Sequence, residues 1–270
     1  MRAWTGPAVT RGLEVVRGLL SPLDAAPPFG TWVPPAGDGV CAGCHAWCPP
    51  GCLRCRACLH TAGQVSRPAP GAVPISLFRT GDQLWRRLRS YKDGPDAAVR
   101  AASQGDLARL LGPFFRSHLA CVAPGVPPDW GLVVVPSTRP RATRYPLERV
   151  VRRCPGLGRR LIRGLRTAHP AEHNRAREDA FTVTRDVAGR SLVVLDDTWT
   201  TGASVQSAAS ALQGAGAHVV GVVVIGRVLN PAAHPGEAAL WALARSQAFR
   251  LDRCCVGRHP GVIRLPQRAG

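Results

Sequence analysis

Short apolar runs, separated by polar and glycine-rich stretches, dominate the second half of the chain. Residues 132–135, 192–195 and 219–225 are almost wholly apolar, and runs of this length without alternation are typical of strands buried on both faces. Residues 203–213, between the last two runs, have a helical pattern that ends near two glycines. Strand, helix and strand in this order predict a βαβ unit, and therefore a parallel sheet with right-handed crossovers.

Helical periodicity marks four further segments. Apolar residues at helical spacing between Val9 and Leu20 predict a short amphipathic helix near the N-terminus. Three other stretches predict helices, over residues 83–91, 106–119 and 237–249. The first of these meets the sequence Lys-Asp-Gly-Pro, which a helix does not continue through.

The apolar run at residues 192–195 leads into a loop with the chemistry of a phosphate site. It delivers Asp196 and Asp197 to the carboxyl end of the predicted sheet, where open α/β folds bind ligands. Helix N-termini present unpaired N–H groups and a positive dipole end, and a glycine lets the backbone approach a phosphate closely. The carboxylates can accept hydrogen bonds from sugar hydroxyls, so this loop can hold a phosphate and a ribose together. The residues that open the predicted helix are Thr200, Thr201, Gly202, Ala203 and Ser204.

A second anion site is predicted in the loop that follows residues 132–135. Arginine suits such a site because its fork of N–H donors makes bidentate contacts with phosphate oxygens. A solvent-exposed basic loop without a ligand is the alternative that this composition leaves open. The candidate residues are Ser137, Thr138, Arg139 and Arg141, with Arg144 just beyond them.

Six of the ten cysteines lie within residues 41–58. Two Cys-x2-Cys pairs at close range can supply the four thiolates of a tetrahedral zinc site. Cys48 and Cys58 are further thiols, and Cys55 with Cys58 forms an alternative pair. A closed shell of four thiolates leaves no position for a substrate, so we expect a structural zinc ion. The preferred ligand set is Cys41, Cys44, Cys52 and Cys55.

The formal net charge of +18 comes almost entirely from arginine. Residues 139–185 contain 13 arginines against four acidic residues, which indicates a polyanionic partner such as a phosphorylated substrate or nucleic acid. The abundance of Ala, Gly and Pro, together with a single lysine, Lys92, fits the codon bias of a GC-rich genome equally well. Both interpretations of the bulk charge stay open.

We expect a cytoplasmic protein that does not enter a membrane. Arg11, Glu14 and Arg17 interrupt the N-terminal stretch that a signal peptide would occupy, and no apolar segment reaches membrane-spanning length. Thiols stay reduced in the cytoplasm, which favours a metal over disulfides for the clustered cysteines.

Residues 192–204 resemble the phosphoribosyl-pyrophosphate (PRPP) signature of type I phosphoribosyltransferases, in which four apolar residues, two acids and a variable pair precede Thr-Thr-Gly-x-Ser/Thr. The resemblance implies an α/β type I phosphoribosyltransferase fold, with a parallel sheet flanked by helices. It implies that residues 200–204 bind the 5-phosphate and that Asp196 and Asp197 hold the ribose 2- and 3-hydroxyls. It also implies Mg²⁺ as the companion of PRPP, and pyrophosphate bound by the loop after residues 132–135.

The order of a four-cysteine knuckle, a linker, a helical segment and a PRPP loop resembles the ComF-type competence family of phosphoribosyltransferase-like proteins. Residues 91–94, Tyr-Lys-Asp-Gly, are similar to that family's Tyr/Phe-Lys motif, and residues 174–181 to its Asn-x-x-x-Ala-Phe region. The family's Arg-Gly-Phe-Asn is absent, and residues 144–147 read Arg-Tyr-Pro-Leu. Because the motif differs, neither the family's catalytic turnover nor the contacts that this motif makes in the family carry over to residues 144–147 by resemblance.

The resemblance implies two functions from different classes. The first is transfer of a phosphoribosyl group from magnesium-bound PRPP to an unidentified acceptor, with release of pyrophosphate. The second is a non-catalytic DNA-uptake factor that binds single-stranded DNA or a helicase partner, for which an arginine-rich surface suits the phosphate backbone. No residue stands out as a catalytic base, and Glu172 and Asp179 are candidates by location alone.

These features predict three parts of the chain. Residues 1–75 hold the N-terminal helix, the zinc knuckle and a linker at residues 61–74. Residues 76–230 form the phosphoribosyltransferase-like domain, and residues 231–270 form a C-terminal helix and a basic tail.

Overall fold

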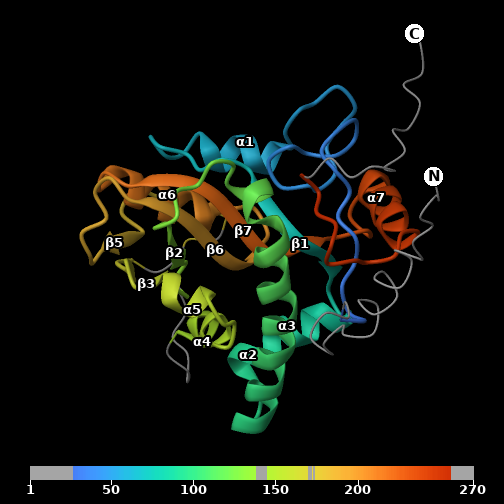
Figure 1. The fold of residues 1–270 in the computed structure, drawn as a ribbon. Coiled ribbons are helices and arrows are strands. Elements are labelled where there is room, and N and C mark those ends of the chain that lie inside the picture. Colours follow the sequence, from blue (N-terminus) through green and yellow to red (C-terminus); the bar gives the residue numbers. More distant parts are fainter. Residues whose placement is uncertain (1–26, 138–144, 170–171, 173, 257–270) are drawn as a thin grey trace, which may run out of the picture.

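Five parallel strands form the central sheet, in the order β1-β7-β6-β2-β3 (Figure 1). The structure, a computed structural model, describes residues 27–137, 145–169, 172 and 174–256. The sequence prediction of a parallel α/β sheet is confirmed. The strands are β1 (Ala72–Arg79), β2 (Gly131–Val134), β3 (Leu161–Ile162), β6 (Ser191–Trp199) and β7 (His218–Leu229).

The middle of the sheet is buried on both faces. Leu192, Leu195, Val222 and Ile225 have no exposed surface, which explains why these strands read as continuous apolar runs instead of alternating ones. β6 and β7 are parallel neighbours, with Leu195 beside Val223. β6 continues beyond its apolar run to Trp199, so the two aspartates of the sequence motif lie within its last part.

Helices cover both faces of the sheet (Figure 1). α2 (Gln83–Asp93) and α3 (Ala97–Val122) connect β1 to β2, and α4 (Pro146–Arg152) with α5 (Leu157–Arg160) connects β2 to β3. α6 (Ala203–Gly214) connects β6 to β7, and so runs across the sheet in the opposite direction. Because crossovers are right-handed, α6 lies on one face of the sheet, and the connecting helices α2, α3, α4 and α5 lie on the opposite face.

Four smaller elements complete the described part of the chain. α1 (Arg56–Ala62) lies next to α6, and α7 (Pro235–Arg245) follows the last strand. β4 (Leu165–Thr167) and β5 (Phe181–Val183) form an antiparallel pair apart from the central sheet.

The helix and strand boundaries differ from the predicted ones in identifiable ways. The helix predicted over residues 106–119 belongs to the longer α3, which begins after Asp96, whose carboxylate accepts a hydrogen bond from Val99 N at 2.8 Å. The predicted C-terminal helix ends earlier, at Arg245. The helix predicted between Val9 and Leu20 lies outside the described residues.

The segment predicted as a linker packs against the sheet domain. Its last residues begin the edge strand β1, and its middle contacts α6. Ala69 N donates to Gln206 Oε1 at 2.8 Å, and Gln213 Nε2 donates to Arg67 O at 2.8 Å. The cysteines at positions 41 and 44 belong to the same hydrophobic core cluster as the sheet, so the cysteine-rich segment rests directly on the α/β fold.

Candidate functional site

A cavity of about 610 Å³ lies at the carboxyl ends of the central strands. β6 and β2 are neighbours there, and the helices that follow them lie on opposite faces of the sheet. The loops therefore part at this point, which is where open α/β sheets bind ligands. Asp196, Asp197, Thr200 and Ser204 all line this cavity, so the structure brings the acids of the predicted site together with two of its hydroxyls.

Asp197 is held by the two residues at the end of α2 that the sequence analysis compared with a family motif. The Tyr91 hydroxyl donates a hydrogen bond to Asp197 Oδ2, and the Lys92 ammonium forms an ion pair with the same oxygen. Asp197 is 5% exposed, and a carboxylate so buried needs such partners to remain charged. The Tyr-Lys pair therefore fixes the position of the Asp197 carboxylate.

Asp196 lies beside Asp197 in a different environment. Its Oδ1 accepts a hydrogen bond from Asp197 N at 2.8 Å. Burial, and then the neighbouring Asp197 carboxylate, raises the pKa of Asp196 to about 7, while Lys92 acts in the lowering direction. Asp196 therefore changes between a hydrogen-bond donor and a charged acceptor close to neutral pH.

The backbone at the start of α6 has a conformation that requires glycine. Gly202 has a φ of 88°, and a Cβ atom there would lie 2.2 Å from the Trp199 ring. Thr200 and Ser204, on either side of this turn, face the cavity. Thr201, Gly202 and Ala203 belong to the same turn but do not line the cavity among the described residues. The glycine thus keeps the turn tight against Trp199 at the N-terminus of α6.

Two side chains from outside the turn hold its carbonyl groups. Arg227, on β7 and 6% exposed, donates through Nη1 to the carbonyls of Trp199 and Thr200 at 2.9 and 2.8 Å. Thr61, at the end of α1, donates through Oγ1 to the carbonyl of Thr201 at 3.1 Å. The turn therefore rests on both the sheet and the cysteine-rich segment, a contact that the sequence pattern did not predict.

The predicted second anion site is described only at its first residue. Ser137 lines the cavity, and its carbonyl accepts a hydrogen bond from Thr167 Oγ1 of β4 at 3.3 Å. The start of that loop therefore lines the same cavity as the aspartates. Thr138, Arg139, Arg141 and Arg144 lie outside the described residues.

The cavity wall also contains residues that the sequence analysis did not single out. Arg163 donates through Nε to Glu148 Oε2 at 2.6 Å, and its guanidinium lies 5.3 Å from the centre of the Tyr145 ring. All three line the cavity. Tyr145 belongs to the segment that departs from the family sequence, and that departure was the one signal that could have drawn attention to it.

Glu172 and Asp179 lie in surface ion pairs. Arg177 Nη2 contacts Asp179 Oδ2 at 2.8 Å, and Arg175 Nη1 contacts Glu172 Oε2 at 3.0 Å. Arg177 lowers the pKa of Asp179 and, together with Arg175, that of Glu172. Neither acid lines the cavity in the described part of the chain, so their location gives no reason to assign them a role as base.

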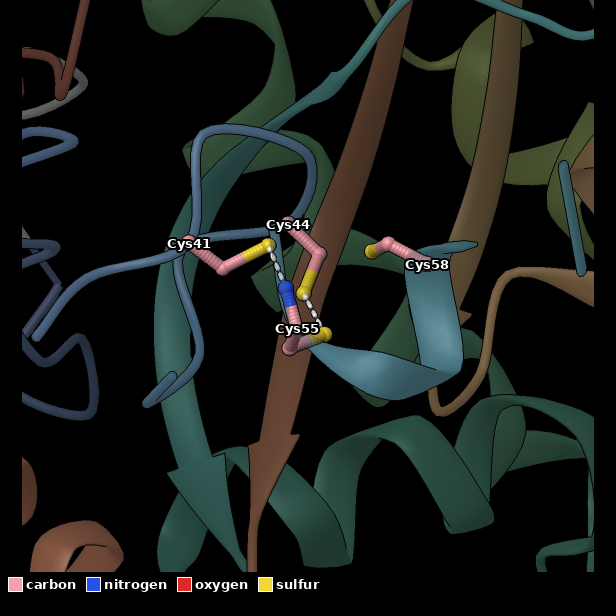
Figure 2. A group of neighbouring side chains, drawn as sticks. All are labelled: Cys41, Cys44, Cys55 and Cys58. Atoms are coloured by element: carbon pink, nitrogen blue, oxygen red, sulfur yellow. Dashed lines mark hydrogen bonds between the residues drawn. The ribbon is translucent and has the colours of Figure 1, made fainter. Parts of the chain in front are cut away.

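The four-cysteine group contains Cys58 in place of the predicted Cys52. Cys52 is exposed, and it lies in a turn in which its N–H donates to Pro49 O at 3.0 Å. Cys55 and Cys58 lie at the start of α1, three residues apart, so both thiols face the same side of the helix (Figure 2). The alternative Cys55–Cys58 pair of the sequence analysis is therefore the one present. The group consists of Cys41, Cys44, Cys55 and Cys58, all buried.

The geometry and chemistry of this group fit a structural zinc ion. Its sulfur atoms lie within 4.8 Å of one another and point to a common centre (Figure 2). The Sγ atoms of Cys44 and Cys55 are 3.8 Å apart, and zinc–sulfur bonds of about 2.3 Å in a tetrahedron give about the same separation. Cys41 Sγ accepts backbone N–H bonds from Gly43 at 3.3 Å and Cys55 at 3.2 Å, which stabilise a thiolate.

No described helix combines the length and apolar character needed to cross a membrane. No protein-family model, curated protein sequence or solved structure matches this chain.

Proposed function

We propose that this chain is a phosphoribosyltransferase-like protein with a type I phosphoribosyltransferase fold, and that it binds magnesium-bound PRPP in the cavity at the sheet edge. One observation carries the proposal. Two adjacent carboxylates and the N-terminus of a helix line the same wall, at the switch point of a parallel sheet.

The start of α6 supplies the 5-phosphate site. α6 has twelve residues, so its first turn offers backbone N–H groups and a positive dipole end. The hydroxyls of Thr200 and Ser204 add donors on the cavity side. Arg227 lies beneath the turn, where it fixes the carbonyls of Trp199 and Thr200. A preorganised set of donors binds an anion with little reorganisation.

Asp196 and Asp197 supply the ribose site. Carboxylates accept hydrogen bonds from hydroxyl groups, and such charge-assisted bonds are stronger than neutral ones. Asp197 is oriented by Tyr91 and Lys92, which leaves Asp196 as the more accessible partner at the cavity wall. Mg²⁺ would arrive with the phosphates, since it prefers oxygen ligands from carboxylates and phosphate groups.

Transfer would break the bond between the ribose anomeric carbon and the pyrophosphate oxygen and form a bond to an acceptor atom. The leaving pyrophosphate carries the departing electron pair, so nearby cations stabilise the transition state. Ser137 and Arg163 line the cavity near the position where this group would lie. The remaining contribution of the protein is to hold donor and acceptor in line.

Isothermal titration calorimetry with magnesium and PRPP tests the proposal. We expect wild-type protein to bind, and Asp196→Asn combined with Asp197→Asn to lose about 100-fold or more in affinity, because two charge-assisted hydrogen-bonding groups are removed. The matched control is Asp129→Asn, an exposed acid outside the cavity, which should bind as wild type does. Wild-type protein that shows no heat with PRPP, while folded by circular dichroism, would exclude the function.

Release of pyrophosphate from PRPP with a panel of nucleobases and amines tests the catalytic step separately. Pyrophosphate formed with one acceptor class, and not with the double variant, supports a transferase. PRPP binding without turnover would instead support the non-catalytic alternative, a DNA-uptake factor. A gel-shift titration with single-stranded DNA at low and moderate salt is the test of that alternative, since binding through phosphates weakens steeply with salt.

A further inference from the structure

A second group of metal-ligating side chains lies outside both sites described above. It consists of His118 and Cys121 on α3 and Cys254 in the segment after α7. One ligand atom from each residue lies within 4.8 Å of the other two. His118 Nδ1 and Cys121 Sγ are 3.9 Å apart. None of these residues contributes to the cavity or to the four-cysteine group in the described part of the chain.

The fold brings the three residues together from two directions. His118 and Cys121 are separated by one helical turn, so both side chains lie on the same side of α3. Cys254 arrives from a segment more than a hundred positions later in the chain. That segment is anchored nearby, because Leu251 and Cys255 on either side of Cys254 are buried in the main hydrophobic core.

The imidazole of His118 is oriented as a ligand would be. The residue is 3% exposed, and its Nε2 lies 2.9 Å from the carbonyl oxygen of Leu251. A carbonyl oxygen accepts hydrogen bonds and cannot donate them, so Nε2 carries the proton and the neutral ring has its lone pair on Nδ1. Metal-ligating histidines commonly use one nitrogen for the metal and donate the other N–H to a backbone carbonyl in this way. Nδ1 is the atom on the side of the Cys121 thiol.

We propose that His118, Cys121 and Cys254 bind a zinc ion, which fastens the C-terminal segment at residues 251–256 to the end of α3. Two thiolates and one imidazole suit zinc, whereas magnesium and calcium prefer oxygen ligands. Three protein ligands leave one tetrahedral position for a further donor such as water. The site is independent of the proposed phosphoribosyltransferase function.

Metal analysis of the full chain, purified without added metal and under a reductant, tests this site. We expect about two zinc ions per chain in wild type, one in each site, and about one in the double variant Cys121→Ser with Cys254→Ser. The matched control is Cys52→Ser, which alters an exposed cysteine outside both groups and should retain about two ions. A double variant that keeps the wild-type zinc content, or a wild type with about one ion, would overturn the proposal.

A measurement on unmodified protein covers the case in which the double variant does not fold. Bound zinc should protect Cys121 and Cys254 from iodoacetamide, and a chelator should raise their alkylation rates by about 10-fold or more, because the free thiolate is the reactive form. Equal rates with and without chelator would contradict a metal at these residues. A disulfide between Cys121 and Cys254 found by peptide mapping, with about one zinc per chain, would also contradict the proposal. These cysteines would then form a covalent link instead of a metal site.

Discussion

The four-cysteine group and the sheet-edge cavity lie on either side of one turn but are built in different ways. The cysteine ligands come from one short segment, all are buried, and their donors face inward to a common centre. The cavity collects its residues from α2, β6, the start of α6 and the loop after β2, and it stays open to a ligand. A closed shell of donors stabilises structure, whereas an open set of charges remains available for binding.

The turn at residues 199–202 joins these two regions. Thr61 reaches it from the helix that carries Cys55 and Cys58, and Arg227 reaches it from β7. Hydrogen bonds with Cys41 and Cys55 raise the pKa of Cys44, while the positive charge of Arg227 acts in the opposite direction. A change in the cysteine group therefore has a short path to the proposed phosphate site.

Removing a metal ligand should have the largest effect and would establish the cysteine group as structural. We expect Cys44→Ser to lower the free energy of unfolding by about 3 kcal/mol or more, because a buried four-thiolate site loses its metal. Cys52→Ser should change it by less than about 0.5 kcal/mol, as usual for an exposed residue. Thermal and denaturant unfolding measure both. If the two variants are equally stable, the four-cysteine group does not stabilise the fold.

Arg227→Met should have an intermediate effect and tests the connection between the two regions. Its loss removes the charged donor that Nη1 supplies to the carbonyls of Trp199 and Thr200, and a hydrogen bond from a charged group contributes about 1.5–3 kcal/mol. We expect weaker PRPP binding by calorimetry with zinc content unchanged. Arg190→Met, at an exposed arginine, is the control for loss of charge. If both variants bind PRPP equally well, the turn does not depend on Arg227.

The change of PRPP affinity with pH should be the smallest of the three effects, and it tests the charge of Asp196. Binding to ribose hydroxyls needs the ionised form, and the pKa of Asp196 is raised to about 7, so affinity should rise by about 10-fold between pH 6 and 8. Asp196→Asn should remove that part of the dependence, which separates it from ionisation of PRPP itself. An unchanged pH profile in this variant would contradict the assignment.

The same raised pKa has an opposite effect on the unliganded fold. The folded state binds the Asp196 proton more tightly than an unfolded chain with its ordinary pKa of 3.8. This contribution to stability is fully present below about pH 4 and is lost as the pH rises through about 7. The charge that favours the ligand therefore destabilises the empty protein.

The sequence predicted the elements whose environment leaves a strong local pattern. Residues 192–195 and 219–225 are buried on both faces, so their apolar runs identify the strands. β1 was missed because Gly71 and Pro74 gave it the composition of a loop. It lies at the edge of the sheet, where a proline is tolerated because one side of the strand needs no ladder partner.

Contacts between distant segments could not be read from spacing. The sequence contains two overlapping Cys-x2-Cys pairs that share Cys55, and spacing alone does not distinguish Cys52 from Cys58 as its partner. The start of α1 selects Cys58, because it turns the thiols of Cys55 and Cys58 towards the same centre. The contact of Tyr91 and Lys92 with Asp197 joins residues more than a hundred positions apart. The acids and hydroxyls of one continuous loop were predictable, whereas the residues that orient them were not.

The position of Lys92 has a consequence for covalent chemistry. It is the only lysine in the sequence, and it lines the cavity beside Asp197. Acylation of a lysine side chain can therefore act only at Lys92, where it neutralises the ammonium and removes the ion pair of a buried carboxylate. An amine-reactive reagent applied to this protein is consequently a single-site label for side chains, and the degree of labelling reports whether the cavity is occupied.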